Sequence, residues 1–189
     1  MGCAAEIRLR QGAEGAGEGA AGGGGGLVLD GGAPSPRPPP AAQAVAPAIA
    51  NFRPTDPQIA WHLARFIEQV RGIAADPIIV RQNWLRAYDF ATDRGALALN
   101  DFARASDPFG RVGRQQVAVE VSSVIRASDD SFRVAWIERT YENGQLARTE
   151  RWTAILTIVV QPARDAERLR KNPLGIFVHA INWSRELGQ

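Results

Sequence analysis

The chain has 189 residues, a length that suits one domain with a substantial core. Its net charge is only +2, so its composition does not favour a nucleic-acid-binding protein. Cys3 is the only cysteine, which excludes an intramolecular disulfide and a zinc site built from cysteines. The uncharged stretch between Arg37 and Arg53 contains four prolines and falls short of the roughly 20 residues of a membrane-spanning helix, so no such helix is predicted.

Glycine, alanine and proline dominate residues 1–51. Such a segment buries too little apolar surface to offset the entropy lost on ordering, so we expect it to be disordered. Its glycine run lacks the Gly-Lys-Ser/Thr ending of a phosphate-binding loop. The folded domain is therefore expected to cover residues 52–189.

Three helices are predicted after this segment. Asp56-Pro57 and Asp76-Pro77 are helix starts, in which an aspartate caps the helix and a proline occupies its first position. The first helix ends at Gly72, the second ends near Gly95, and the third covers about residues 96–105. The apolar face of the first helix comprises Ile59, Leu63, Phe66, Ile67 and Val70.

Four strands are predicted in the second half of the chain. The central pair, residues 131–142 and 145–160, flanks Asn143-Gly144, a dipeptide typical of a type I′ hairpin turn. Residues 115–125 precede this pair, and residues 176–184 follow one or two helical turns within 164–171. In the first strand, alternation predicts that Val117, Val119, Val121 and Ile125 face the core. Helices followed by an antiparallel meander predict an α+β fold, with a curved sheet around the first helix.

No pattern of catalytic residues emerges from the sequence. His62 and His179 are interpreted as surface or packing residues, because neither belongs to a paired or metal-binding motif. The glutamates of the hairpin are expected to form cross-strand ion pairs with its arginines: Glu138, Glu142 and Glu150.

The tryptophans divide into two groups. Three are predicted to lie in the core: Trp84, Trp136 and Trp152. Trp61 and Trp183 are assigned less clearly to an inward face, and we predict that they lie at a protein interface, where tryptophan is enriched.

Several long segments carry a family resemblance: RQNWLRAYDFATDRGA, WIERTYENG, ERWTAILTIVVQP and KNPLGIFVHAINWSREL. In order and without large gaps, from about Phe52 to Gln189, they resemble TrbF-like proteins. These are the conjugal-transfer members of the inner-membrane scaffold proteins of type IV secretion systems. The resemblance implies a nuclear-transport-factor-2-like fold, in which helices are cradled by a curved four-stranded antiparallel sheet.

The resemblance also implies a function without catalysis, cofactor or metal. Proteins of this family are assembly scaffolds with a periplasmic domain that self-associates, here as a homodimer, and contacts other channel components. Neither nucleic acid nor a small-molecule ligand is expected as a partner. The family's Asn-Pro-x-Gly motif matches Asn172, Pro173, Leu174 and Gly175, so self-association and partner contact are predicted there.

The N-terminus departs from the family, whose members carry a cytoplasmic tail and one transmembrane helix before the periplasmic domain. Our hypothesis is that residues 1–43 arise from a misassigned start or a frameshift. If they are genuine, membrane anchoring is in doubt and a soluble adaptor is a further alternative.

An isomerase or dehydratase on the same fold is the enzymatic alternative, since fold does not settle function. It requires a deep pocket lined by Tyr88 and Asp89. The scaffold hypothesis instead predicts an interior without convergent polar groups, closed by Trp84, Phe90, Trp136 and Trp152.

Overall fold

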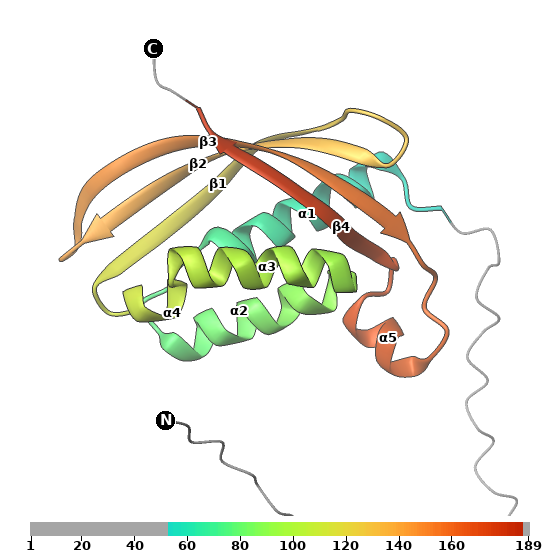
Figure 1. Ribbon diagram of the computed structural model, residues 1–189, viewed down its shortest axis with the longest axis horizontal. Helices are drawn as coiled ribbons and strands as arrows, with labels where there is room; N and C mark the ends of the chain where they lie inside the picture. The colour runs from blue at the N-terminus through green and yellow to red at the C-terminus, as the bar shows by residue number, and fades with distance from the viewer. Residues whose placement is uncertain (1–52, 187–189) are drawn as a thin grey trace, which may run out of the picture. The chain divides into compact units, whose positions relative to one another are not determined.

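Four helices precede the first strand, and a fifth lies between the last two strands, along residues 53–186, the part of the chain described by the computed structural model in Figure 1. The helices are α1 (Asp56–Arg71), α2 (Pro77–Asp89), α3 (Asp93–Ser106), α4 (Pro108–Arg111) and α5 (Ala166–Lys171). The strands are β1 (Gln115–Arg126), β2 (Ser131–Glu142), β3 (Gln145–Val160) and β4 (Ile176–Arg185). The predicted disordered segment, residues 1–51, lies outside the described residues.

The strands form one antiparallel sheet in the order β1-β2-β3-β4. The sheet curves, and α1, α2 and α3 lie on its concave side (Figure 1). This arrangement confirms the predicted α+β fold with its meander of four strands. β4 is an edge strand, and α5 lies in the connection that leads to it.

The core lies between α1 and the concave face of the sheet. All five apolar residues predicted for the inner face of α1 are at most 3% exposed. Opposite them, alternate residues of β2 and β3 point inward, since successive side chains of a strand face opposite sides. The sheet side chains that are buried there include Phe132, Val134, Trp136, Ala154 and Leu156.

The central hairpin turns as the sequence predicts. Asn143 has a φ of 50° and Gly144 a φ of 76°, as a type I′ turn requires at both positions. The turn joins β2 to β3, and the register shifts by one residue between Tyr141 and Thr140, so that Trp136 lies opposite Trp152. Side chains separated by sixteen residues of sequence are therefore stacked, with ring centroids 6.3 Å apart.

The prediction for β1 is correct for three valines and wrong for Ile125. The register shifts between Val121 and Ser123, which leaves Ser122 as an extra residue in the strand. Such a bulge reverses the faces of all later residues. Val124 consequently packs against the core, whereas Ile125 is 49% exposed.

Both predicted helix starts are present. The cap of α1 is Thr55, one residue before the predicted Asp56, and its backbone N–H donates to Oε1 of Gln58 at 2.8 Å. Asp76 caps α2 as predicted, because its carboxylate accepts from the backbone N–H of Ile78 at 2.7 Å.

The predicted boundary between α2 and α3 is wrong. α2 ends at Asp89, because the next residues pair with β4: the N–H of Val178 donates to the carbonyl of Phe90 at 2.8 Å. Gly95 then lies inside α3 and does not end a helix. A Cβ at Gly95 would overlap the carbonyl oxygen of Val178, so this glycine permits close packing of helix and strand.

No helix within residues 53–186 combines the length and the apolar character needed to cross a membrane.

Candidate functional site

The turn from Asn172 to Gly175 leads from α5 into β4. The side chain of Asn172 spans this turn and hydrogen-bonds the first residue of β4. Asn172 is 3% exposed, its Nδ2 donates to the carbonyl oxygen of Ile176 at 2.8 Å, and its Oδ1 accepts from the N–H of Ile176 at 3.3 Å. The N–H of Gly175 donates to the carbonyl of Asn172 at 3.1 Å. The amide thus satisfies both backbone groups of one residue and fixes where β4 begins.

Two features of the backbone at position 175 favour glycine over any other residue. Its φ is 61°, in the left-handed region, and a Cβ there would overlap the backbone of Gln161. The N–H of Gln161 donates to the carbonyl of Gly175 at 2.7 Å, so the end of β3 lies against the turn. Of the three turn residues predicted for self-association, Pro173 alone is solvent-exposed, whereas Asn172 and Gly175 maintain the shape of the turn.

The two predicted interface tryptophans occupy different environments. Trp61 is 62% exposed on α1, and the guanidinium of Arg65 lies 5.6 Å from its ring centroid. Trp183 is half-buried on β4 and meets Phe102 of α3 edge to face, with centroids 4.7 Å apart. Trp183 therefore lines the interior of the domain, and only Trp61 presents most of its surface to solvent.

The helix that carries Trp61 lies beside the start of β4. His62 is buried, its ring centroid lies 4.3 Å from that of Phe90, and it contacts the backbone of Ile176. Burial lowers the pKa of His62 to about 4, and the backbone of Ile176 opposes this shift. The prediction that His62 is a packing residue is confirmed, and the contact brings α1 next to the turn.

The prediction for Glu138 is wrong, because this residue is buried and pairs with a helix. Its Oε1 accepts from Nε of Arg71 at 2.6 Å and from Nε1 of Trp136 at 2.8 Å. The side chains of Arg71 and Glu138 are 6% and 8% exposed. The predicted interior without convergent polar groups is therefore also wrong.

Aromatic rings surround the guanidinium of Arg71. Its Cζ lies 4.1 Å from the ring centroid of Trp152, and three further centroids lie within 6 Å, a range in which cations are attracted to ring faces. These are Phe102 at 5.0 Å, Trp183 at 5.3 Å and Trp136 at 5.7 Å. The cluster links α1, α3, β2, β3 and β4 through a single cation.

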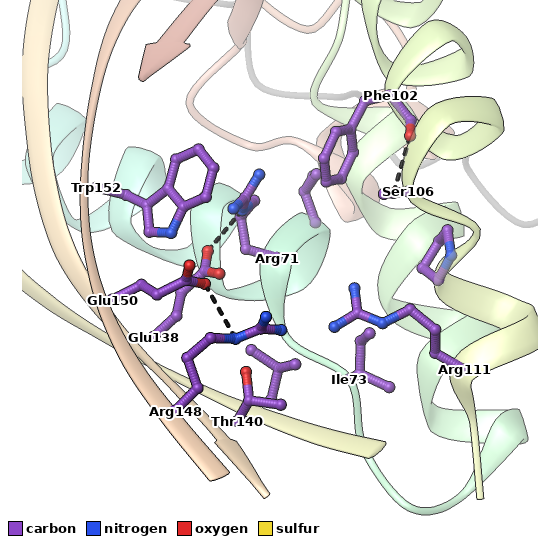
Figure 2. A pocket seen from close by; sticks show the side chains of 13 residues that line it. Arg71, Ile73, Phe102, Ser106, Arg111, Glu138, Thr140, Arg148, Glu150 and Trp152 are labelled. Atoms are coloured by element: carbon purple, nitrogen blue, oxygen red, sulfur yellow. Dashed lines mark hydrogen bonds and ion pairs between the residues drawn. The ribbon is translucent and has the colours of Figure 1, made fainter. Parts of the chain in front are cut away.

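A pocket of about 200 Å³ opens beside this cluster and is shown in Figure 2. We call it the arginine pocket, because three arginines line it: Arg71 of α1, Arg111 of α4 and Arg148 of β3. Glu138, Glu150 and Trp152 also line it, together with the hydroxyl residues Ser106 and Thr140. The guanidinium groups of Arg111 and Arg148 extend toward one another across the opening (Figure 2).

The charges of the pocket wall are unevenly paired. Nε of Arg148 lies 3.5 Å from Oε2 of Glu150, whose other oxygen accepts from Nη1 of Arg185 at 2.9 Å. Nε of Arg111 donates to the neutral amide oxygen of Gln115 at 2.8 Å. Burial lowers the pKa of Arg111, and the positive charge of Arg148 lowers it further.

Sequence alternation contains part of the signal for this site. Glu138 and Thr140 continue the inward-facing series that begins with Phe132, and both are buried. On α1, Arg71 follows Ile67 at helical spacing and so belongs to the buried face. No pattern within one element indicates that these two residues meet.

A second groove, of about 530 Å³, lies where the enzymatic alternative requires a pocket. Tyr88 and Asp89 line it, but exposed charged residues of α5 form its other side. Asp89 lies 3.4 Å from Nζ of Lys171, which also pairs with Glu167 at 3.1 Å. A carboxylate in a solvated ion-pair network lacks the seclusion that general-base catalysis needs, so the groove does not favour an enzyme.

Comparisons with known proteins relate the domain to secretion machinery. The model of the VirB8 protein family matches residues 40–186. A conjugal transfer protein TrbF from Rhizobium radiobacter is 27% identical over 128 residues, which cover 66% of this chain. The matched region spans only 58% of the relative's length.

Solved structures of three such proteins share the fold. VirB8 of Agrobacterium tumefaciens superposes with a TM-score of 0.60 at 13% identity, covering 73% of this chain and 99% of VirB8. TrwG, a type IV secretion component of Bartonella birtlesii, superposes with a TM-score of 0.57 at 14% identity, covering 68% of this chain and 91% of TrwG. TraE, in complex with 4-(1H-pyrrol-1-yl)pyridine-2-carboxylic acid, superposes with a TM-score of 0.59 at 16% identity, covering 71% of this chain and 100% of TraE. The predicted nuclear-transport-factor-2-like fold is thereby confirmed.

Proposed function

The chain belongs to the VirB8 family, and we propose that it is a non-enzymatic assembly component of a conjugative type IV secretion system. The observation that carries this proposal is the family match over residues 40–186, together with the similarity to a protein named for conjugal transfer. Because a shared fold alone does not imply a shared function, the residue-level similarity is the stronger support.

Self-association is proposed to use the surface that contains Trp61 and the Asn172–Gly175 turn. Trp61 and Pro173 are exposed, and α1 contacts the start of β4 through His62. An exposed tryptophan is the kind of anchor that dominates interface energies. Trp183 contributes indirectly in this proposal, because it packs inside the domain.

The location and the partners are proposed by membership of the family. We assign residues 53–186 to the periplasmic side of the inner membrane, where they would contact other channel proteins. No nucleic-acid partner is included, because a net charge of only +2 gives no reason to propose one.

Complementation tests the proposal. A donor strain that lacks its own TrbF-like protein would receive this full chain, or the chain with a transmembrane helix fused to its N-terminus. At least one form is expected to restore plasmid transfer, and Trp61→Ala in that form is expected to reduce it. Leu146→Ala, which removes another exposed apolar side chain, is the matched control. Folded protein at normal abundance without any transfer would refute the proposal.

A further inference from the structure

The arginine pocket contains more positive than negative charge. Three guanidinium groups line it, a fourth from Arg185 shares Glu150, and only two carboxylates face them. Oε1 of Glu138 accepts from both Arg71 and Trp136. Among the residues that line the pocket, three cations against two anions leave an excess of one positive charge, and Arg185 adds a further cation next to Glu150.

Arg111 is the cation with the least compensation. It is half-buried, and within residues 53–186 no carboxylate forms an ion pair with it. Its Nε is occupied by Gln115, which leaves its terminal amino groups directed into the pocket (Figure 2). Burial and the charges of Arg148 and Arg71 lower its pKa, while the charges of Glu138 and Glu150 oppose this shift.

A further donor lies in the same wall. Nε1 of Trp152 is buried and has no acceptor among the described residues. Buried donors are normally paired, so this N–H adds one uncompensated donor to the cationic wall. Guanidinium groups and an indole N–H together form a set of donors that lacks a matching anion.

We propose that the arginine pocket binds a carboxylate, held between Arg111 and Arg148. Guanidinium groups match the planar carboxylate and bind it through paired hydrogen bonds. The two glutamates in the wall favour a single negative charge over a dianion such as phosphate, because each repels added negative charge. This inference stands on the pocket alone and is independent of the proposed function.

The carboxylate can come from a small organic acid or from an acidic side chain of a protein partner. A volume of about 200 Å³ lies below the roughly 300–1,000 Å³ of typical small-molecule sites. It is large enough for the end of an aspartate or glutamate side chain. The experiment therefore compares both sources.

Titration calorimetry on the purified full chain tests the site with four probes: acetate, acetamide, inorganic phosphate and a capped peptide with one central glutamate. Acetate and the peptide are expected to bind saturably, and acetamide is expected not to bind. Tighter binding of the peptide than of acetate would identify a protein side chain as the source, and equal affinities would identify a small acid. Tighter binding of phosphate than of acetate would overturn the assignment to carboxylate.

Arginine variants locate the binding. Arg111→Gln and Arg148→Gln are each expected to weaken acetate binding about tenfold or more, as the loss of a charge-assisted hydrogen bond implies. Arg133→Gln, on the opposite face of the sheet, is the control and should bind as the unchanged chain does. Arg148 is half-exposed, so its variant should fold normally. Unchanged affinity in a folded Arg148→Gln, or no acetate binding by the unchanged chain, would refute the proposal.

Discussion

The guanidinium of Arg71 at the end of α1 donates to Glu138 in the middle of β2 at 2.6 Å, across 67 residues of sequence. Both side chains are buried, and the same carboxylate oxygen accepts from the indole of Trp136. One ion pair thus fixes the distance between the long helix and the sheet. Its position among four aromatic rings makes it part of the core as well as of the pocket wall.

Glu138→Gln is expected to destabilise the domain by about 3–5 kcal/mol, because it leaves Arg71 as a buried charge without a counter-ion. The free energy of unfolding, measured by urea titration with tryptophan fluorescence, checks this. Glu120→Gln is the matched control, since Glu120 pairs with Arg139 at the surface and exposed pairs contribute under about 1 kcal/mol.

The double variant Arg71→Met with Glu138→Leu distinguishes the charge from the packing. Apolar residues of similar volume remove both desolvation costs, so the double variant is expected to be more stable than Glu138→Gln alone. A double variant that is less stable than the single one would show that the ion pair itself stabilises the domain.

The fold was predictable where the signal lies within one element. The apolar stripe of α1, the Asp76 cap and the Asn143-Gly144 turn each depend on nearby residues, and all are present as predicted. The predictions failed where contact with a segment distant in the sequence determines the local structure. Gly95 has the sequence signature of a helix end, but its close approach to Val178 keeps it inside α3.

The arginine pocket was not predictable for the same reason. Its arginines come from α1, α4 and β3, and each one by itself is typical of a solvated surface. The buried position of Glu138 follows from alternation in β2, yet its partner depends on how α1 crosses the sheet. Convergence of charges from separate elements is a tertiary property and leaves no local pattern.

Gly175→Ala is expected to destabilise the domain by about 1–3 kcal/mol, since it adds both a strained φ and an overlap with the backbone of Gln161. Thermal or urea unfolding measures the loss. Gly144→Ala is the matched control: its φ is also positive, but a Cβ there meets nothing within 4 Å. The difference between the two variants therefore isolates the overlap, and equal losses would contradict this account.

His62 is expected to make the stability of the domain fall as the pH drops. Its pKa is lowered from 6.5 to about 4 by burial, so the unfolded chain takes up a proton at a higher pH than the folded domain. The stabilisation is complete above pH 6.5 and is lost as the pH falls toward 4. Between about pH 7 and about pH 4.5 the loss should amount to about 2–3 kcal/mol.

The variant His62→Phe isolates this contribution. Phenylalanine can pack against Phe90 and does not titrate, so the variant should lose less stability than the unchanged chain over the same pH range. The pKa of Asp56 is lowered by its hydrogen bond with Arg126, so the stabilisation from that carboxyl group is lost only at more acidic pH. Urea unfolding at several pH values checks the difference, and identical pH profiles would exclude a role for His62.

Trp61→Ala is expected to weaken self-association without unfolding the domain. Because Trp61 is 62% exposed, its removal should change the free energy of unfolding by no more than about 0.5 kcal/mol. As an interface anchor, it should contribute about 2 kcal/mol or more to association. Sedimentation equilibrium measures the dissociation constant, and Leu146→Ala, 56% exposed near the hairpin turn, provides the control. If Trp61→Ala and Leu146→Ala associate equally well, the self-association surface lies elsewhere, because an anchor of this size cannot be removed without a measurable loss of affinity.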